Sequence, residues 1–292
     1  MNLITVFTRF PDQEACIEHL ENIRWGENPY CPHCGSIRVA RKGESDRIGR
    51  WNCHDCHASF NVMAGTIFSK TRIPLQKWFM AVCLVINAKK SLSSCQLARD
   101  LDLNQKTAWY LIQRIRAEMA TKQADLLHGI VEADETYIGG KPRKQNKRDD
   151  DEPKAPRGRA TSKTAIIGVV ERGGQVSARV ATGLKGKDIL RFIKDNVEPA
   201  GSLLITDEYR AYNAVKNFVP HSVINHAVQY ADGVIHTNTI ESFWALIKRA
   251  WYGSHHHYQK AYTPMYVAES CWKYNNRAND NAFGTFFRGC FA

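Results

Sequence analysis

Residues 130–140, with the sequence IVEADETYIGG, begin the part of the chain that decides its fold, because the residue pattern changes there from helical to strand-like. Two more strand-like runs follow at 164–174 and 176–183. Helix-like and strand-like runs then alternate: a helix at 187–197, a strand at 203–207, a helix at 208–218 and a strand at 221–225. Several strands followed by this alternation predict an α/β or α+β domain with a mixed sheet.

Residues 141–163 interrupt this pattern between the first two strands. The sequence KPRKQNKRDDDEPKAPRGRATSK is almost without apolar residues and carries blocks of both charge signs. A connection of this length is uncommon inside a compact domain, and is usually functional or disordered. We therefore expect a flexible loop, whose basic half either contacts DNA or forms a solvated extension.

Two Cys-x-x-Cys motifs stand upstream, Cys31-Pro-His-Cys34 and Cys53-His-Asp-Cys56, separated by 18 residues. Two such turns can complete a closed tetrahedral shell of four thiolates, which leaves no position open for water. We therefore predict a structural zinc ion, held by a zinc ribbon at 27–68. Disulfides or a redox pair fit less well, because the other five cysteines are scattered and the total of nine is odd.

A lead-in helix is expected before the ribbon, within residues 1–26. Basic residues and a tryptophan lie between the two cysteine motifs, and they favour contact with nucleic acid, while a solvated basic hairpin is the alternative. These residues are Arg38, Arg41, Lys42, Arg47, Arg50 and Trp51.

Residues 69–127 are predicted to be helical, and residues 91–119 have the layout of a helix-turn-helix. Ser93 or Ser94 is expected to cap a short first helix. A break at 102–104 then separates it from a second, longer helix. The residues expected to face inward on that second helix are Ala108, Leu111, Ile112 and Ile115.

The start of the second helix enters the major groove in DNA-binding motifs of this kind. We therefore predict Gln105, Lys106 and Arg114 as DNA contacts. An ordinary helical hairpin with a polar outer face is the alternative. The other side chains expected at the outer face are Thr107, Tyr110 and Arg116.

Composition favours an anionic partner. The formal net charge is +11 over 292 residues, which points first to nucleic acid, although ribosome-associated and membrane-surface proteins share this signature. The longest strongly apolar run, at 78–88, is far short of the roughly 20 residues that cross a bilayer. The opening residues lack the pattern of a secretory signal. We therefore expect a cytoplasmic, nucleoid-associated protein that does not bind membranes.

Three carboxylates lie in local patterns that a tertiary fold could bring together. Asp134 is in the strand-like run at 130–140, Asp207 ends a strand-like run, and Glu241 is near the start of a helix-like run. Cutting a phosphodiester requires neutralisation of charge and activation of a weak oxygen nucleophile, which two divalent ions can supply. Carboxylates are the ligands that Mg²⁺ prefers.

Each of these acids also has an ordinary explanation. Asp134 could be one of several solvent-facing acids on its strand, together with Glu132 and Glu135. Asp207 could cap the helix that begins near Glu208. Glu241 stands three residues after an asparagine and could complete a capping box. The case for one site therefore depends on the combination.

Together these motifs resemble the insertion-sequence transposases of the ISXO-like group, which have an N-terminal zinc ribbon and an RNase H-like catalytic domain with an Asp-Asp-Glu (DDE) triad. The resemblance covers nearly the whole chain. It rests on CPHCGS at 31–36, EADETYIGG at 132–140, TDEYRAY at 206–212, HTNTIESFWALIKR at 236–249 and WKYNNR at 272–277.

The resemblance implies that residues 128–292 form the catalytic domain, with Asp134 on its first strand, Asp207 at the end of its fourth strand and Glu241 as the third acid. Glu132, Glu135 and Glu208 are interpreted as neighbours outside the triad. Lys248 matches a basic residue of the family, and seven helical positions return it to nearly the same face as Glu241. We therefore predict Lys248 as a DNA contact.

The implied activity is a transposase reaction with two Mg²⁺ or Mn²⁺ ions and no nucleotide cofactor. Such an enzyme binds the terminal inverted repeats of its element, frees 3′-hydroxyl ends and joins them to target DNA. Because transposition joins two ends, the resemblance also implies a homodimer or higher oligomer on DNA. A DNA-binding regulator without catalysis, and an RNase H-like nuclease or resolvase, are the alternatives.

Other polar and aromatic residues near these motifs carry weaker signals. The run of His255, His256 and His257 could contact DNA or the active site, but a surface loop is the more ordinary interpretation. The tryptophans and tyrosines that follow Glu241 could stack on bases, but aromatic residues at helical spacing usually belong to the core. These are Trp244, Trp251, Tyr252, Trp272 and Tyr274.

Overall fold

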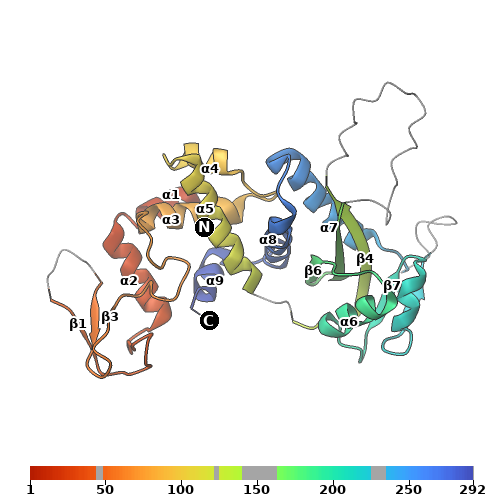
Figure 1. The fold of residues 1–292 in the computed structure, drawn as a ribbon, viewed down its shortest axis with the longest axis horizontal. Coiled ribbons are helices and arrows are strands. Elements are labelled where there is room, and N and C mark those ends of the chain that lie inside the picture. The colour runs from red at the N-terminus through yellow and green to blue at the C-terminus, as the bar shows by residue number, and fades with distance from the viewer. Residues whose placement is uncertain (44–48, 122–124, 140–162, 225–234, 292) are drawn as a thin grey trace. The chain divides into compact units, whose positions relative to one another are not determined.

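The computed structural model describes residues 1–43, 49–121, 125–139, 163–224 and 235–291. It divides into two compact units, whose elements Figure 1 labels. Unit 1 consists of Met1–Lys122 together with Ala278–Ala292, and unit 2 consists of Gln123–Arg277. The catalytic domain predicted at 128–292 therefore differs from unit 2 at its C-terminal boundary. The predicted loop at 141–163 lies almost entirely outside the described residues.

Unit 1 opens with two helices, α1 (Leu3–Arg9) and α2 (Gln13–Arg24). The second is the predicted lead-in helix, and Asp12 caps it by accepting a hydrogen bond from the backbone N–H of Ala15 at 2.9 Å. A small antiparallel sheet follows, in the order β1-β2-β3. Its strands are β1 (Val39–Arg41), β2 (Trp51–Cys53) and β3 (Ser59–Phe60).

Three helices follow the small sheet: α3 (Leu75–Asn87), α4 (Ser94–Asp100) and α5 (Gln105–Thr121). The predicted cap is present, because Ser93 Oγ accepts a hydrogen bond from the N–H of Gln96 at 3.1 Å. The predicted break also forms, with Asp102 at a φ of +47°. Asn104 Oδ1 then accepts from the N–H of Thr107 at 2.8 Å and starts α5. The four residues expected to face inward on α5 are all buried.

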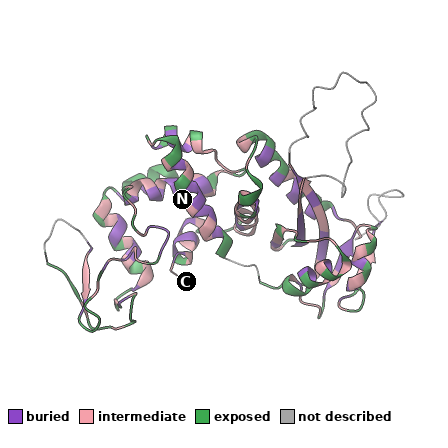
Figure 2. Ribbon diagram, in the orientation of Figure 1, coloured by how far each residue is buried: buried purple, intermediate pink, exposed green. Residues whose placement is uncertain are grey.

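The last helix, α9 (Ala282–Gly289), completes the aromatic core of unit 1. Phe287 is fully buried, and its ring centroid lies 4.4 Å from that of Phe79 on α3 and 5.8 Å from that of Phe68. Phe283 packs beside it against Phe10 and Phe79. Figure 2 shows buried positions along one side of α5 and α9. This packing explains why the last residues belong to the N-terminal unit.

Unit 2 is built on a five-stranded mixed sheet in the order β6-β5-β4-β7-β8. Its strands are β4 (Ile130–Ile138), β5 (Thr164–Glu171), β6 (Val176–Val180), β7 (Leu203–Thr206) and β8 (His221–Val223). The first three pair antiparallel, while β4 pairs parallel with β7, and β7 parallel with β8. The predicted mixed sheet is therefore confirmed.

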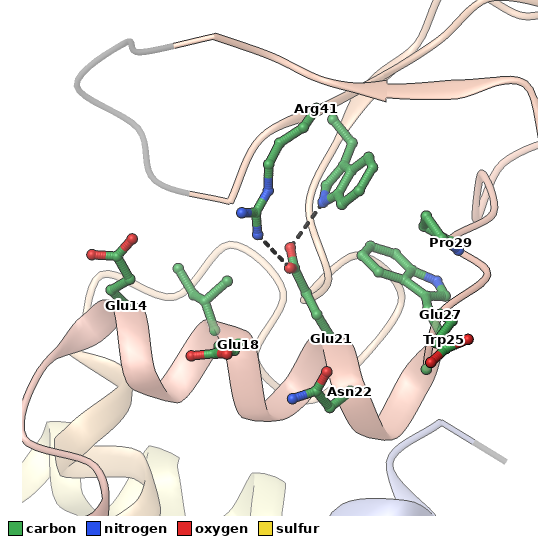
Figure 3. Close-up of a pocket in the computed structure, with 11 residues that line it drawn as sticks. Glu14, Glu18, Glu21, Asn22, Trp25, Glu27, Pro29 and Arg41 are labelled. Atoms are coloured by element: carbon green, nitrogen blue, oxygen red, sulfur yellow. Dashed lines mark hydrogen bonds and ion pairs between the residues drawn. The ribbon is translucent and has the colours of Figure 1, made fainter.

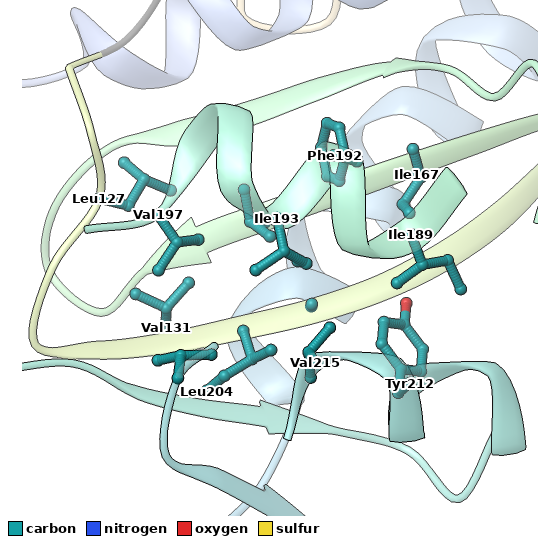
Figure 4. Packing of buried hydrophobic residues seen from close by; sticks show 13 residues of the cluster. Leu127, Val131, Ile167, Ile189, Phe192, Ile193, Val197, Leu204, Tyr212 and Val215 are labelled. Carbon is teal, nitrogen blue, oxygen red and sulfur yellow. The ribbon is translucent and has the colours of Figure 1, made fainter. Parts of the chain in front are cut away.

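Helices cover both faces of this sheet. On one face, α6 (Gly186–Asn196) and the 3₁₀ helix η2 (Arg210–Val215) pack over β4, β5 and β7. Figure 4 shows this core. Its labelled residues include Val131, Ile167, Phe192, Leu204 and Tyr212.

The other face carries α7 (Asn238–Arg249), followed by the π-helical turn η3 (Ala250–His255) and by α8 (Thr263–Asn275). Successive strand residues point to opposite faces. Val131 and Ala133 belong to the α6 core, so Glu132 and Asp134 point towards α7.

Two details differ from the sequence expectations. The helix predicted at 208–218 is a shorter 3₁₀ helix, Arg210–Val215, because Asp207 and Tyr209 form a turn before it. A further helix, α1, precedes the expected lead-in helix. Within the part of the chain that the structure describes, no helix combines the length and apolar character needed to cross a membrane.

The α9 packing yields a stability prediction. Replacing Phe287 with alanine removes a fully buried ring from unit 1 and should cost about 3 to 5 kcal/mol. The same change at Phe7, whose side chain is 60% exposed, should cost far less. Thermal melting of the full chain compares the two variants. Equal melting temperatures for the Phe287→Ala and Phe7→Ala variants would contradict the described packing of α9.

Candidate functional site

The four predicted zinc ligands lie together in unit 1. The Sγ atoms of Cys31, Cys34, Cys53 and Cys56 are all within 4.8 Å of one another. Cys31 and Cys56 have their Sγ atoms 3.6 Å apart, as do Cys34 and Cys53. A tetrahedral ion with Zn–S bonds of about 2.3 Å needs sulfur separations of about 3.8 Å. The four thiols therefore fit a structural Zn²⁺ with no open coordination position.

Glu21 of α2 links the ribbon to the helices of unit 1, as Figure 3 shows. Its carboxylate accepts hydrogen bonds from Trp51 Nε1 at 2.8 Å and from the Arg41 guanidinium at 2.6 Å. These three residues line a pocket of about 580 Å³. Further carboxylates in its lining are Glu14, Glu18 and Glu27. This side of the ribbon is therefore acidic and unsuited to a phosphate backbone.

Two of the basic residues between the cysteine motifs are paired with acids. Arg41 binds Glu21, and Arg38 donates to Asp55 at 2.7 Å. Arg47 lies outside the described residues. Because paired guanidinium groups have less charge to offer to DNA, the basic count of the ribbon overstates its capacity for phosphate contact.

The predicted DNA contacts on α5 have different surroundings. Gln105 and Lys106 are exposed at the start of the helix, and Gln105 Nε2 donates to Ser94 Oγ at 2.9 Å. Arg114 is half-buried and donates to the carbonyl of Thr66 at 3.2 Å. Part of its hydrogen-bonding capacity therefore holds α5 to the last residues of the predicted ribbon.

The sequence predicted Arg116 on the outer face of α5, but the structure buries it. Its side chain is 2% exposed and donates to Ser91 Oγ at 3.1 Å. Position 116 lies one helical turn after the buried Ile112, so the arginine turns inward, and the hydroxyl of Ser91 accepts one of its hydrogen bonds.

Asp134 lies in the middle of unit 2, on the face of β4 that α7 covers. Trp244 Nε1 on α7 donates a hydrogen bond to Asp134 Oδ2 at 3.0 Å. Burial and the adjacent carboxylate of Glu135, with a smaller contribution from Asp207, raise the pKa of Asp134 to about 7. A partly buried carboxylate whose charged form is disfavoured in this way, beside other acids, is typical of a functional site.

Asp207 directly follows β7, the parallel neighbour of β4. Glu132 is paired with Ile205 in that ladder. Because the two strands are parallel, the residues two positions further along, Asp134 and Asp207, also lie side by side. The two aspartates therefore lie at neighbouring positions of the sheet. Asp207 Oδ1 also accepts from the backbone N–H of Tyr209 at 3.0 Å, so its turn-forming use, expected as the ordinary alternative, exists beside the site.

The sequence suggested that Glu132 could be a solvent-facing acid, but it is buried. Its side chain is 0% exposed and accepts from the N–H of Thr239 at 2.8 Å and of Ile240 at 3.0 Å. The hydroxyl of Thr239 donates to it at 2.9 Å, and Arg172 Nε donates at 2.6 Å. Arg172 in turn donates to the carbonyl of His236 at 2.9 Å. A carboxylate of β4 thus caps the first turn of α7, where the helix dipole favours an anion.

Glu241 follows Ile240 in the same first turn of α7 and is exposed. Its Oε1 accepts a hydrogen bond from Thr237 Oγ1 at 3.2 Å. The capping box considered from the sequence is not formed with Asn238, because α7 begins at that residue and Glu132 serves the amides. The buried network around Glu132 therefore fixes the helix turn from which Glu241 projects.

Trp244 is a second link between α7 and β4. It packs directly on Gly168, where an added Cβ would lie 2.6 Å from the indole ring. Gly168 is paired with Asp134 across the β4–β5 ladder. The missing side chain on β5 therefore lets the indole approach closely enough for its Nε1 to reach the aspartate on β4.

Asp134 and Asp207 are neighbours on the sheet, and Glu241 lies on α7, the helix that packs on the Asp134 face. Among the described residues, Asp134, Asp207 and Glu241 do not form a group whose oxygen atoms all lie within 4.8 Å. In a two-ion site, with the ions about 3.5 to 4 Å apart, the three acids need not all contact the same ion. Their oxygen donors are of the kind that Mg²⁺ prefers. The oxygen donors of the three acids are therefore compatible in kind with hard divalent ions.

Lys248 is exposed near the end of α7, and the predicted set of aromatic residues is divided. Trp244, Trp251 and Trp272 are buried, whereas Tyr252 is 63% exposed. The histidine run does not form a metal cluster within the described residues. His255 instead packs its ring against Tyr266, with centroids 4.7 Å apart.

Comparison with known proteins places both units. Residues 126–275 match the family model of the ISXO2-like transposase domain, which is slightly more than half of the chain. The chain belongs to the ISXO2-like transposase family. Residues 11–59 match the transposase zinc-ribbon domain, which confirms the predicted ribbon. The mixed sheet of unit 2 and the cysteine cluster of unit 1 are thus parts of one transposase chain.

A curated relative supports this family assignment. The "uncharacterized protein in transposable element ISH50" of Halobacterium salinarum is 30% identical over 258 residues, which cover 84% of this chain and 85% of the relative. Among solved structures, the Mos1 strand transfer complex aligns with a TM-score of 0.30 and 14% identity over 73% of each chain. A pre-cleavage Mos1 transpososome gives 0.28 and 12% over 72% of this chain and 73% of the other. Scores this low assign neither site residues nor chemistry.

Sequence reasoning missed Glu132, Arg172 and Gly168 as parts of this transposase site. One signal was available: Glu132 has the same strand parity as Asp134, while Arg172 directly follows the neighbouring antiparallel strand. The use of Glu132 as a cap could not be read from the sequence, because more than a hundred residues separate it from the helix that it caps.

The Glu132 network predicts a local effect of substitution. Glu132→Gln keeps the shape but removes the charge facing Arg172 and the α7 amides, and breaking such a buried pair costs about 3 to 5 kcal/mol. Hydrogen exchange at Thr239 and Ile240 should accelerate more than exchange in β5. Glu208→Gln, a change at the exposed acid that follows Asp207, serves as the control. Unchanged exchange at both amides would contradict the capping role.

The raised pKa of Asp134 predicts a pH-dependent gain in stability on its removal. The pKa of Asp134 in the folded state, about 7, exceeds the ordinary aspartate pKa of about 3.9, so the folded state binds the proton more tightly, and the charged form destabilises the fold as the pH rises. Asp134→Asn should raise the free energy of unfolding by up to about 4 kcal/mol at pH 8 and by less at pH 5. The melting temperature should rise accordingly. Melting without added divalent ions, compared at the two pH values, measures this. A lower melting temperature at pH 8 would refute it.

Proposed function

We propose that the chain is a DDE transposase that binds the terminal inverted repeats of an insertion sequence, cuts DNA to free 3′-hydroxyl ends and joins these ends to target DNA. The observation that carries the proposal is the placement of Asp134 on β4 beside Asp207 at the end of the parallel strand β7, with Glu241 on the helix whose first turn Glu132 of β4 caps. Family membership supports this reading of the three acids.

The three acids are assigned as ligands of two Mg²⁺ or Mn²⁺ ions. Such ions neutralise charge on the phosphate and activate the attacking oxygen at neutral pH. Asp134 and Asp207 are held by the sheet, and Glu241 is held through the first turn of α7. Because Asp134 sits on a strand, Asp207 directly follows one and Glu241 sits on a helix, the carboxylates can be positioned to a fraction of an ångström.

The protein's own groups also define where DNA lies. Lys248 follows Glu241 by seven residues on α7 and is assigned to a phosphate near the cut bond. Gln105 and Lys106, exposed at the start of α5, are assigned as contacts to the DNA of the terminal repeat. Arg114, on the same helix, is assigned as a further contact to this DNA. Transposition joins two ends, so the working form is a homodimer or higher oligomer on DNA.

The proposal predicts a separation of cutting from binding. Alanine at Asp134, Asp207 or Glu241 should reduce strand cutting in Mg²⁺ by several orders of magnitude, because each variant loses a metal ligand, while affinity for the element end stays within a few-fold. Glu208→Ala, next to Asp207 and exposed, should cut normally. Gel assays on end-labelled DNA of the element's terminus measure both quantities.

The same assay distinguishes the competing activities. A wild-type chain that binds element ends but never cuts in Mg²⁺ or Mn²⁺ would indicate a regulator. Cutting that ignores the terminal sequence would indicate a general nuclease. Full activity after any one of the three alanine substitutions would remove that residue from the site.

A further inference from the structure

A pocket of about 270 Å³ lies in unit 2 between the end of β4 and the end of α7. Tyr137 and Gly139 line it from β4 and the residue after it, Lys163 from the residue before β5, and Lys248 from α7. The aromatic residues of η3 close it from the side of the helix end. All of these residues belong to the same unit and to the described part of the chain.

The pocket has one fixed and one exposed aromatic wall. Trp251 is 6% exposed and packs in the core beneath α7, so its ring is held in place. Tyr252 stands against it edge to face, with centroids 4.8 Å apart and an interplanar angle of 86°. The Tyr252 side chain is nevertheless 63% exposed. An aromatic face left open beside a pocket is available for stacking by a flat ligand.

The two lysines give the same pocket a positive charge. Neither Lys163 nor Lys248 forms an ion pair with any described residue, and no carboxylate is part of the pocket lining. Two ammonium groups without a described acidic partner favour an anionic group such as a phosphate. Aromatic walls and lysines together suit a ligand that has both a flat ring and a phosphate.

The position of the pocket relates it to the catalytic acids. Lys248 lies seven residues after Glu241, which is about 10 Å along the helix axis. Tyr137 lies three residues after Asp134 on β4. A distance of about 10 Å corresponds to about three nucleotide steps of one DNA strand at 3.4 Å each. The pocket is thus within reach of the strand whose phosphate would be cut.

We infer that this pocket binds a single unstacked nucleotide of the DNA strand, about three steps from the cut bond, with its base on Tyr252 and its phosphate on Lys163 and Lys248. The inference rests on the proposed function, because it takes the three acids to mark the cut. A base inside a duplex has both faces covered, so it must leave the stack to reach an aromatic wall. The volume, below the usual 300 to 1,000 Å³ of sites for larger ligands, suits one nucleotide and not a base pair.

Photocrosslinking tests this subsite directly. The full-length protein is bound to element-end DNA that carries 5-iodouracil at one position at a time, with Ca²⁺ in place of Mg²⁺, and crosslinked residues are identified by mass spectrometry. The expected result is a crosslink to Tyr252 from one or two positions about three nucleotides from the cut bond. Tyr252→Leu should abolish it, while Tyr30→Leu, a change at another exposed tyrosine, should leave it intact.

A binding titration tests the phosphate part. Lys163→Gln should lower the slope of log affinity against log salt by about 0.7 for single-stranded DNA, because one phosphate contact is lost. Lys187→Gln, at an exposed lysine of α6, should not change the slope. Loss of Tyr252 should weaken binding of the end roughly 5- to 150-fold.

Crosslinks spread evenly along the strand, or an unchanged yield in Tyr252→Leu, would overturn the inference. Its failure is separable from failure of the proposed function, since crosslinking is read without cutting. A wild-type chain that cuts in Mg²⁺ but shows no crosslink to Tyr252 loses the subsite and keeps the activity. A chain that gives the position-specific crosslink but does not cut keeps the subsite and loses the proposed reaction.

Discussion

The buried carboxylate of Glu132 at the first turn of α7 is the interaction on which the arrangement of the candidate site depends. It joins β4, where Asp134 lies, to the helix that carries Glu241 and Lys248. An uncompensated charge at this depth would be strongly destabilising, but here two backbone amides, a hydroxyl and the guanidinium of Arg172 satisfy it. Helix position and strand position are therefore coupled through one side chain.

On the same face of the sheet, Asp134 is held in surroundings that disfavour its charged form. Gly168 leaves space for Trp244, whose indole packs beside the half-buried Asp134 and donates a hydrogen bond to it. Partial burial, with Glu135 and Asp207 nearby, raises the pKa of Asp134 and makes its charged form unfavourable; under the proposed function, a bound cation would offset this cost. A site that is destabilised when empty and stabilised by its ligand is common among enzymes.

Much of this structure could be predicted from the sequence, because the signals were local. The double Cys-x-x-Cys motif has the spacing that a zinc shell requires, and Ser93 and Asn104 are side chains that cap helices. The α9 contribution to unit 1 and the Glu132 cap could not be predicted. Both depend on contacts between segments more than a hundred residues apart, for which helical or strand periodicity gives no information. Periodicity did not place Arg116 either, since a buried arginine needs a specific partner, here Ser91.

The central claim is that Asp134, Asp207 and Glu241 form one divalent-metal site. The most direct measurement is a crystal structure of the protein on element-end DNA with Mn²⁺, in which anomalous scattering locates the ions. The account predicts two ions about 3.5 to 4 Å apart, with oxygen atoms of all three acids among their ligands. Ions bound to Glu135 or Glu208 in place of any of the three, or no ion between β4, β7 and α7, would contradict it.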